Sequence, residues 1–225
     1  MTSTTNVYLP IIVCRLLLVA LDLDTILGEV TIGQRRKKLK EVARGKGQSD
    51  AYVATLDRVK AQKGNKSVLG LKVLMWVLYS QRPLQAEELC HALGVEIGSS
   101  DLDPENVLTS RTLLSSCLGL VTVEESSSTL RLVHPTLRRY FLSHPTIFQY
   151  PDSRIAEVCL TYLNSACLWD LSRTPDSAPP VMPFLEYASC YWVKHARRGM
   201  VENLEPLALR LLNRRAMQFD LKLLD

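Results

Sequence analysis

The sequence lacks the motifs on which most enzymatic sites are built. It contains no GxxxxGK[ST] phosphate-binding loop, no GxSxG nucleophile elbow and no CxxC pair. The nearest approach to a phosphate loop is Gly64-Asn65-Lys66-Ser67, where the glycine and the lysine are separated and no strand precedes them. Neighbouring carboxylates such as Glu87-Glu88 and Glu124-Glu125 point in different directions, so we interpret each as solvated surface. The sequence therefore predicts that the chain is not an enzyme.

Patterns typical of metal sites and disulfide frameworks are also missing. None of the four histidines is paired at a spacing of i, i+4, which disfavours a metal site. Most of the six cysteines lie within apolar helical patterns: Cys14, Cys90, Cys117, Cys159, Cys167 and Cys190. We interpret them as buried, reduced thiols, with metal ligation as the alternative. This usage predicts a reducing compartment, and we expect the protein in the cytoplasm, with no cofactor of its own.

No apolar run is long enough to span a bilayer. The longest, Val7–Leu21, has 15 residues and is interrupted by Pro10 and Arg15. The first six residues carry no basic side chain, so a secretory signal is poorly supported. We therefore expect no membrane partner.

Charge is modest overall and concentrated in one segment. The formal net charge is +4, while Arg35–Lys46 contains seven basic residues and one acid, or +6, which leaves −2 for the rest of the chain. Within Thr31–Ala43 the apolar residues Ile32, Leu39 and Val42 fall near helical spacing. We interpret this basic helix as a solvated face, with nuclear import or phosphate binding as the alternative.

The most informative stretch of the sequence runs from Leu113 to Leu142. Leu120–Val123 and Thr129–Val133 have the composition of strands, and the polar residues between them suit a hairpin loop. Gly119 ends the helix that precedes the first strand, and a second helix follows His134-Pro135. A helix, a small hairpin and a departing helix are typical of a winged helix.

The remaining segments predict helices on both sides of this hairpin. They are Arg15–Leu27, Asp50–Lys60, Leu71–Tyr79 (capped by Ser67), Ala86–Leu93, Asn106–Leu118, Ile155–Leu163, Phe184–Arg197 and Leu204–Arg214. We expect a mainly α fold with a two-stranded β-hairpin wing, whose core contains Leu74, Trp76, Leu89, Leu114, Val121, Leu132 and Tyr140.

Winged helices often bind DNA, and a nucleic-acid-binding winged helix is the alternative function. Its reading helix would be Asn106–Leu118, whose only cation is Arg111, and the wing tip carries Glu124 and Glu125. Because contacts from Lys and Arg to phosphates dominate DNA affinity, this surface disfavours DNA. Affinity would have to come from the basic segment, so we expect no nucleic-acid partner.

Several segments resemble fungal NACHT-type (STAND) signalling ATPases, in the region after the nucleotide-binding domain. They are Leu17–Asp24, Asp50–Arg58, Arg82–Leu93, Leu130–Leu142 and Phe184–Arg197. The resemblance implies a helical lid remnant over residues 1–48, a winged helix domain over 50–145 and a helical connector over 150–225. In that family ankyrin or other repeats commonly follow. The same winged helix is a module named after GPI inositol-deacylase.

The resemblance also implies a role for His134. In related signalling ATPases a histidine at the end of the hairpin contacts the β-phosphate of ADP, and His134 lies at the matching, semi-exposed position. The alternative is a histidine that caps the hairpin or bonds a local carbonyl. The P-loop and Walker B segments have no counterpart here, so the resemblance implies a truncated paralogue or fragment.

The function that follows from the resemblance is a non-enzymatic regulatory module. It would act through protein partners or self-association, and would meet a nucleotide only through a separate P-loop domain. A protein related to GPI or lipid deacylases is a third and more distant interpretation.

Overall fold

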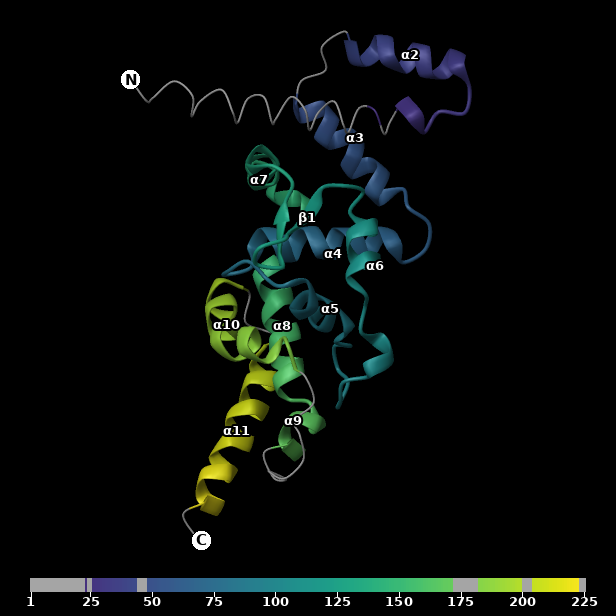
Figure 1. The fold of residues 1–225 in the computed structure, drawn as a ribbon. Helices are drawn as coiled ribbons and strands as arrows, with labels where there is room; N and C mark the ends of the chain where they lie inside the picture. The colour runs from purple at the N-terminus through teal and green to yellow at the C-terminus, as the bar shows by residue number, and fades with distance from the viewer. Residues whose placement is uncertain (1–22, 24–25, 44–47, 172–181, 200–203, 223–225) are drawn as a thin grey trace, which may run out of the picture. The chain divides into compact units, whose positions relative to one another are not determined.

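The computed structural model describes residues 23, 26–43, 48–171, 182–199 and 204–222. These residues form helices, with one hairpin of two antiparallel strands among them (Figure 1). The expected fold class, mainly α with a two-stranded wing, is confirmed. The predicted helix Arg15–Leu27 lies outside the described residues except at positions 23, 26 and 27.

Contacts divide the chain into two units, which are treated separately below. Unit 1 comprises Met1–Leu74, Leu114–Thr122 and Arg131–Ile147, and unit 2 comprises Met75–Leu113, Val123–Leu130 and Phe148–Asp225. The division falls inside helix α4 (Lys66–Tyr79), inside helix α6 (Ser110–Ser116) and inside the hairpin, so both units receive a part of each.

Unit 1 begins, in its described part, with two helices that differ in exposure. Helix α2 (Ile32–Ala43) starts at a capping pair, in which Thr31 Oγ1 accepts from Gln34 N at 3.2 Å and Gln34 Oε1 accepts from Thr31 N at 3.1 Å. Helix α3 (Gln48–Lys60) buries Tyr52, Leu56 and Val59, as its apolar spacing predicts. The two helices thus show how a stripe at helical spacing becomes core only where another element covers it.

The first half of α4 packs closely in unit 1 because it contains a glycine. A Cβ at Gly70 would overlap the backbone oxygen of Ser116 and lie 2.8 Å from Val59 Cγ1. The predicted N-cap Ser67 is wrong: α4 begins one residue earlier, and the Ser67 hydroxyl donates to the Lys60 carbonyl at 2.9 Å. Ser67 therefore ties α4 back to the end of α3.

The hairpin follows a helix that is shorter than expected. Asp103 and Pro104 start only one 3₁₀ turn, η1 (Pro104–Asn106), and helix α6 (Ser110–Ser116) comes after it. The chain then turns through Leu118 at φ 47° and Gly119 at φ 83°, a left-handed conformation that favours glycine. The strands β1 (Val121–Glu124) and β2 (Thr129–Leu132) form the predicted wing.

Helix α7 (Pro135–Leu142) leaves the hairpin and packs against α3 within unit 1. Of the expected core residues, Leu74, Trp76, Leu89 and Val121 are buried. Leu114, Leu132 and Tyr140 are only half-buried, and their neighbours Leu113, Leu130 and Phe141 are buried instead. The expected core is thus displaced by one or two residues in α6, β2 and α7.

Unit 2 contains a helix of the winged-helix region and the helices that follow it. These are α5 (Ala86–Gly94), α8 (Pro151–Leu163), α9 (Ala166–Leu171), α10 (Leu185–Arg198) and α11 (Glu205–Lys222). The 3₁₀ turn η2 (Pro145–Ile147) precedes α8 and is the last element of unit 1. Helices α8 and α10 lie side by side, and α5 and α11 also contact α8 (Figure 1). Among the described residues, no helix is long and apolar enough to cross a membrane.

An aromatic cluster forms the centre of unit 2. Trp76 meets the rings of Phe184 and Tyr187 edge-on, with centroids 5.6 and 6.1 Å apart, and Tyr162 meets Phe184 at 5.2 Å. Trp76 is 1 % exposed, which confirms its predicted place in a core. Its ring partners come from α10 and the residue before it, so this core extends beyond the winged-helix segments.

Candidate functional site

His134 caps helix α7 at its junction with the wing. The residue is extended, and Pro135 occupies the first helical position, where its missing N–H costs nothing. The Nδ1 atom of His134 accepts from the backbone N of Thr136 at 3.2 Å. The side chain is 5 % exposed, so the expected semi-exposed position is wrong: the ring is buried and serves as an N-cap.

This hydrogen bond determines which ring nitrogen of His134 carries the proton. A backbone N–H can only donate, so Nδ1 is unprotonated and the proton lies on Nε2. Among the described residues, Nε2 of His134 makes no hydrogen bond. The Nε2–H of His134 is thus a donor without a partner among the described residues, on a ring that is 5 % exposed.

The surroundings of His134 join α3 to α7. Thr136 Oγ1 lies 2.8 Å from His134 Nδ1 and 2.5 Å from the hydroxyl of Tyr52. The Tyr52 and Tyr140 rings are in contact at 5.7 Å, and Tyr140 lies against His144 at 4.5 Å. A change at His134 therefore reaches the α3–α7 packing through one threonine.

A second histidine site lies in unit 2 and was not predicted from the sequence. His195 Nδ1 lies 2.6 Å from Asp152 Oδ1, and its Nε2 lies 2.8 Å from the Tyr187 hydroxyl. The same hydroxyl accepts from the backbone N of Gln81 at 3.0 Å. Because a carboxylate only accepts, Nδ1 carries the proton and Nε2 accepts from Tyr187. This chain of bonds joins α8 to α10 and both to the segment after α4.

Burial governs the ionisation of this second site. It lowers the pKa of His195, against the opposing effect of Asp152, and the nearby Arg198 lowers that pKa further. Burial also raises the pKa of Tyr187 to about 12. The imidazole is thus held neutral between two hydrogen-bond partners, with no exposed atom at which a substrate could react. Its arrangement suits the joining of helices.

Glu88 corrects the expectation that both members of the Glu87-Glu88 pair are solvated. Glu87 is exposed, but Glu88 is 4 % exposed and forms two bonds with Arg82, at 2.7 and 2.8 Å. Glu88 also accepts from the backbone N of Gln85 at 2.8 Å. The hydrogen bond to Glu88 raises the pKa of Arg82, whose guanidinium lies 5.4 Å from the centre of the Tyr187 ring. The pair therefore starts α5 and covers the buried Tyr187.

An open cavity of about 430 Å³ lies beside α5 in unit 2. Its lining includes Glu87, Cys90 and His91 from α5, residues 107–110 and Pro183. Burial, and then the charge of Glu87, raises the pKa of the Cys90 thiol, so the thiolate needed for nucleophilic attack is disfavoured. Burial lowers the pKa of His91. The described residues include no group of three side chains placed to hold a metal ion.

The cysteines follow the expectation of buried thiols in part. Cys90, Cys117 and Cys159 are free and buried, whereas Cys167 is half-buried and Cys190 is exposed. Cys14 lies outside the described residues. Burial raises the pKa of the Cys117 thiol to about 12, so this sulfur behaves as a small apolar side chain.

The face that a DNA-reading winged helix would use carries little positive charge. Ser110, Arg111, Thr112 and Ser115 are the exposed residues of α6, and Arg111 is the single cation of that helix. At the wing, Glu124 is half-buried and Glu125 is exposed. With the exposed Arg131 of β2, the charges of α6 and the wing (Arg111, Glu124, Glu125 and Arg131) sum to zero, which offers a polyphosphate little net attraction.

A comparison with protein-family models matches residues 56–156 to the family described as GPI inositol-deacylase, winged helix domain. The match covers the segment from α3 to the start of α8, which includes α4, α5, α6, the wing and α7. Comparisons with curated proteins and with solved structures gave no match. Together with the hairpin geometry, the family match assigns a winged helix domain to this segment.

Proposed function

We propose that this winged helix domain is a non-enzymatic regulatory module, the winged-helix part of a NACHT-type signalling switch. In this proposal the chain acts in the cytoplasm through protein partners or self-association and binds no cofactor of its own. A P-loop domain outside these 225 residues supplies the nucleotide. The winged helix closes against that domain when ADP is bound and separates from it in the active state.

The observation that carries the proposal is the orientation of His134. Its Nδ1 accepts from the backbone N of Thr136 at the start of α7, and the buried ring therefore holds the Nε2–H donor in one direction. A donor fixed in this way loses little entropy when it meets a phosphate oxygen, and the bond to a charged oxygen is stronger than a neutral one. These features support a role as a sensor of a bound nucleotide.

The charges of α6 and the wing support a protein partner over a nucleic acid. Arg111 and Arg131 are balanced by Glu124 and Glu125, so these elements offer a polyphosphate backbone no net positive charge. A protein surface imposes no such requirement, since partners of either charge exist.

A titration in trans tests the proposal. A recombinant NACHT domain that retains its P-loop, taken from a relative, is loaded with ADP or with a non-hydrolysable ATP analogue and titrated with this chain by calorimetry. We expect saturable binding to the ADP-loaded domain and binding at least about tenfold weaker to the ATP-loaded one. Equal binding in both states, or none in either, contradicts the proposal.

A matched pair of variants tests the role of His134 in the same titration. His134→Ser keeps an oxygen that can cap α7, because serine is a preferred N-cap residue, but removes the Nε2–H donor. Loss of one hydrogen bond to a charged oxygen weakens ADP-dependent binding by roughly 10- to 100-fold. The exposed His144→Ser serves as the control and is expected to bind like the parent. If both variants bind alike, His134 is not the sensor.

A further inference from the structure

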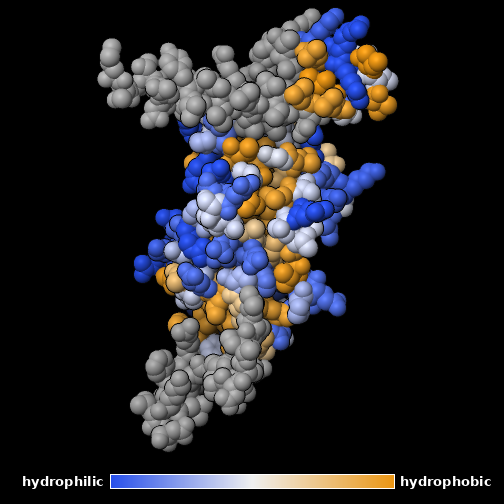
Figure 2. All heavy atoms as spheres, in the orientation of Figure 1, coloured by the Kyte–Doolittle hydropathy of each residue, from blue (hydrophilic) through white to orange (hydrophobic). Residues whose placement is uncertain are grey.

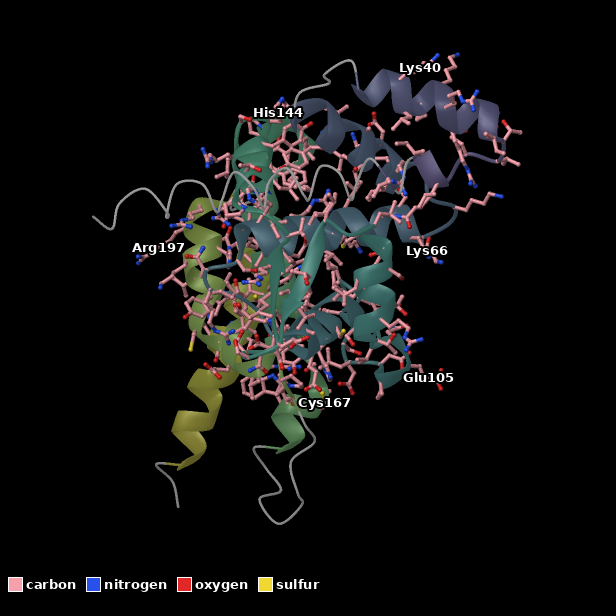
Figure 3. All side chains as sticks on the ribbon, turned by 45° about the horizontal axis from the view of Figure 1, so that its top comes forward. Lys40, Lys66, Glu105, His144, Cys167 and Arg197 are labelled. Carbon is pink, nitrogen blue, oxygen red and sulfur yellow. The ribbon has the colours of Figure 1, made fainter. Side chains whose placement is uncertain are left out.

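Helix α2 carries a dense group of cations that face solvent. Between Ile32 and Lys40 there are five basic residues and no acid: Arg35, Arg36, Lys37, Lys38 and Lys40. All of them are exposed except Lys38, which is half-buried. Figure 3 shows Lys40 extending away from its helix. Arg35 instead folds back onto the carbonyls of Leu27 and Glu29, at 3.3 and 2.9 Å. A strong local positive field therefore surrounds α2.

Helix α2 and the described residues just before it expose large apolar side chains. Val30 is 90 % exposed, Ile32 75 % and Leu39 54 %, and Leu23 and Leu27 are exposed as well. Ile32 and Leu39 are seven residues apart, so they lie on one face of the helix. In Figure 2 apolar orange and charged blue surfaces alternate over the described part of this element. Apolar groups exposed at this density indicate a surface that another body covers.

We infer that α2 lies on the surface of an anionic lipid bilayer and tethers the chain there. Lysine and arginine meet the lipid headgroups, while Ile32 and Leu39 enter the boundary of the acyl chains. The capping pair of Thr31 and Gln34 defines where the helix begins, so the two apolar residues keep their common face. This inference goes beyond the proposed function and revises the expectation that the chain has no membrane partner.

A lipid surface fits these observations better than a nucleic acid. A polyphosphate would satisfy the cations, but it offers nothing to cover Val30, Ile32 and Leu39. A bilayer satisfies both sets at once, because its charged surface and its apolar interior lie a few ångströms apart. The charge and the exposed apolar residues therefore point to the same partner.

Vesicle sedimentation with the full chain tests the electrostatic half of the inference. The vesicles are pure phosphatidylcholine, or phosphatidylcholine with about 30 % phosphatidylserine, at about 0.1 M salt. We expect binding only to the anionic vesicles. Replacing Arg36, Lys37 and Lys40 together by glutamine reduces the partition coefficient by roughly a hundredfold. The control replaces the exposed Lys60, Lys63 and Lys66 by glutamine, removes the same charge and changes binding less than about twofold.

The apolar half needs its own pair of variants. Ile32→Ser with Leu39→Ser keeps every charge, and we expect it to weaken vesicle binding by about tenfold or more. The control, Val68→Ser with Leu142→Ser, removes residues of similar exposure elsewhere in unit 1 and leaves binding unchanged. Because all four side chains face solvent, these variants should melt like the parent.

Three results overturn the inference. The first is no binding to the anionic vesicles, and the second is an equal loss in a variant and its matched control. The third concerns a short duplex DNA tested at the same salt concentration. If the DNA binds the chain more tightly than the vesicles do, and binds the Ile32→Ser, Leu39→Ser variant as well as the parent, the partner is a nucleic acid.

Discussion

His134 in unit 1 and His195 in unit 2 are both buried, yet they carry their protons on different nitrogens. At His134 a backbone N–H donates to Nδ1, so the proton lies on Nε2 and faces away from the helix cap. At His195 the carboxylate of Asp152 accepts from Nδ1, so Nε2 accepts from Tyr187. The comparison teaches that the neighbour of one nitrogen decides what the other can do.

The two sites also differ in how completely they are enclosed. Both nitrogens of His195 are used inside unit 2, and the ring is 0 % exposed. His134 uses Nδ1 for structure, and its Nε2–H has no hydrogen-bond partner among the described residues. We therefore interpret His195 as a joint between helices and His134 as the residue that is available to a partner.

Removing Trp76 has the largest expected effect on this comparison. Its ring supports Phe184 and Tyr187, so Trp76→Ala opens a cavity beside the His195 site and costs about 3–5 kcal/mol of unfolding free energy. Trp192→Ala, at a half-buried position of α10, is the control and should cost about 1 kcal/mol. Urea denaturation of both variants provides the measurement. A parent-like Trp76→Ala would place the ring outside the core.

Tyr187→Phe removes one hydroxyl from the buried His195 site and should have the next largest effect on stability. It leaves the buried His195 Nε2 and the part-buried backbone N of Gln81 without their partner, which costs about 1–3 kcal/mol. The exposed positions of α10 allow a control, Ser189→Ala, for which we expect a change within about 0.5 kcal/mol. Denaturation midpoints separate the two variants. Equal midpoints would show that the hydroxyl contributes nothing to the joint.

The sequence predicts the parts of the fold that depend on neighbouring residues. Gly119 marks the left-handed turn before the wing, and the polar residues 124–128 mark its loop. Pro135 marks the end of the second strand, so the place of His134 at the hairpin end follows from local signals, whereas its expected role comes only from the family resemblance. The all-round apolar composition of the segment around Trp76 likewise identifies the centre of the core.

The parts that were missed depend on residues distant in the chain or on helix phase. Asp152 and His195 are 43 positions apart, and no local pattern joins them. Glu88 is buried because Arg82 reaches it across the extended segment before α5, and a reading of adjacent carboxylates overlooks that partner. In α6 the choice between Leu113 and Leu114 depends on the phase of a seven-residue helix, which is too short to define it.

The pH dependence of stability reports on the buried His195. Burial lowers the pKa of His195 below its usual 6.5, so from 6.5 down to the folded-state pKa the unfolded chain binds more protons than the folded one. The stabilisation is therefore complete above pH 6.5 and is lost as the pH falls through the folded-state pKa. His91, whose pKa burial also lowers, acts in the same direction.

Unfolding free energies measured between about pH 7.5 and 5 test this dependence. We expect His195→Gln to flatten the loss of stability on acidification, because its contribution is absent at every pH. His91→Gln removes the contribution of His91, and the double variant should be the flattest of the series. An unchanged slope in His195→Gln would mean that the buried imidazole does not titrate differently in the folded and unfolded states.

The smallest expected effect concerns the capping role of His134. His134→Ala removes the acceptor of the Thr136 N–H, and loss of an N-cap costs about 1 kcal/mol. His134→Ser removes the same ring but supplies another oxygen for the cap, so it should be more stable than the alanine variant by about 0.5–1 kcal/mol. Because both variants lose the packing of the ring, their difference isolates the hydrogen bond. Thermal melts of the two proteins measure it. If they melt together, Nδ1 contributes nothing to α7, and nothing then fixes the proton of His134 on Nε2.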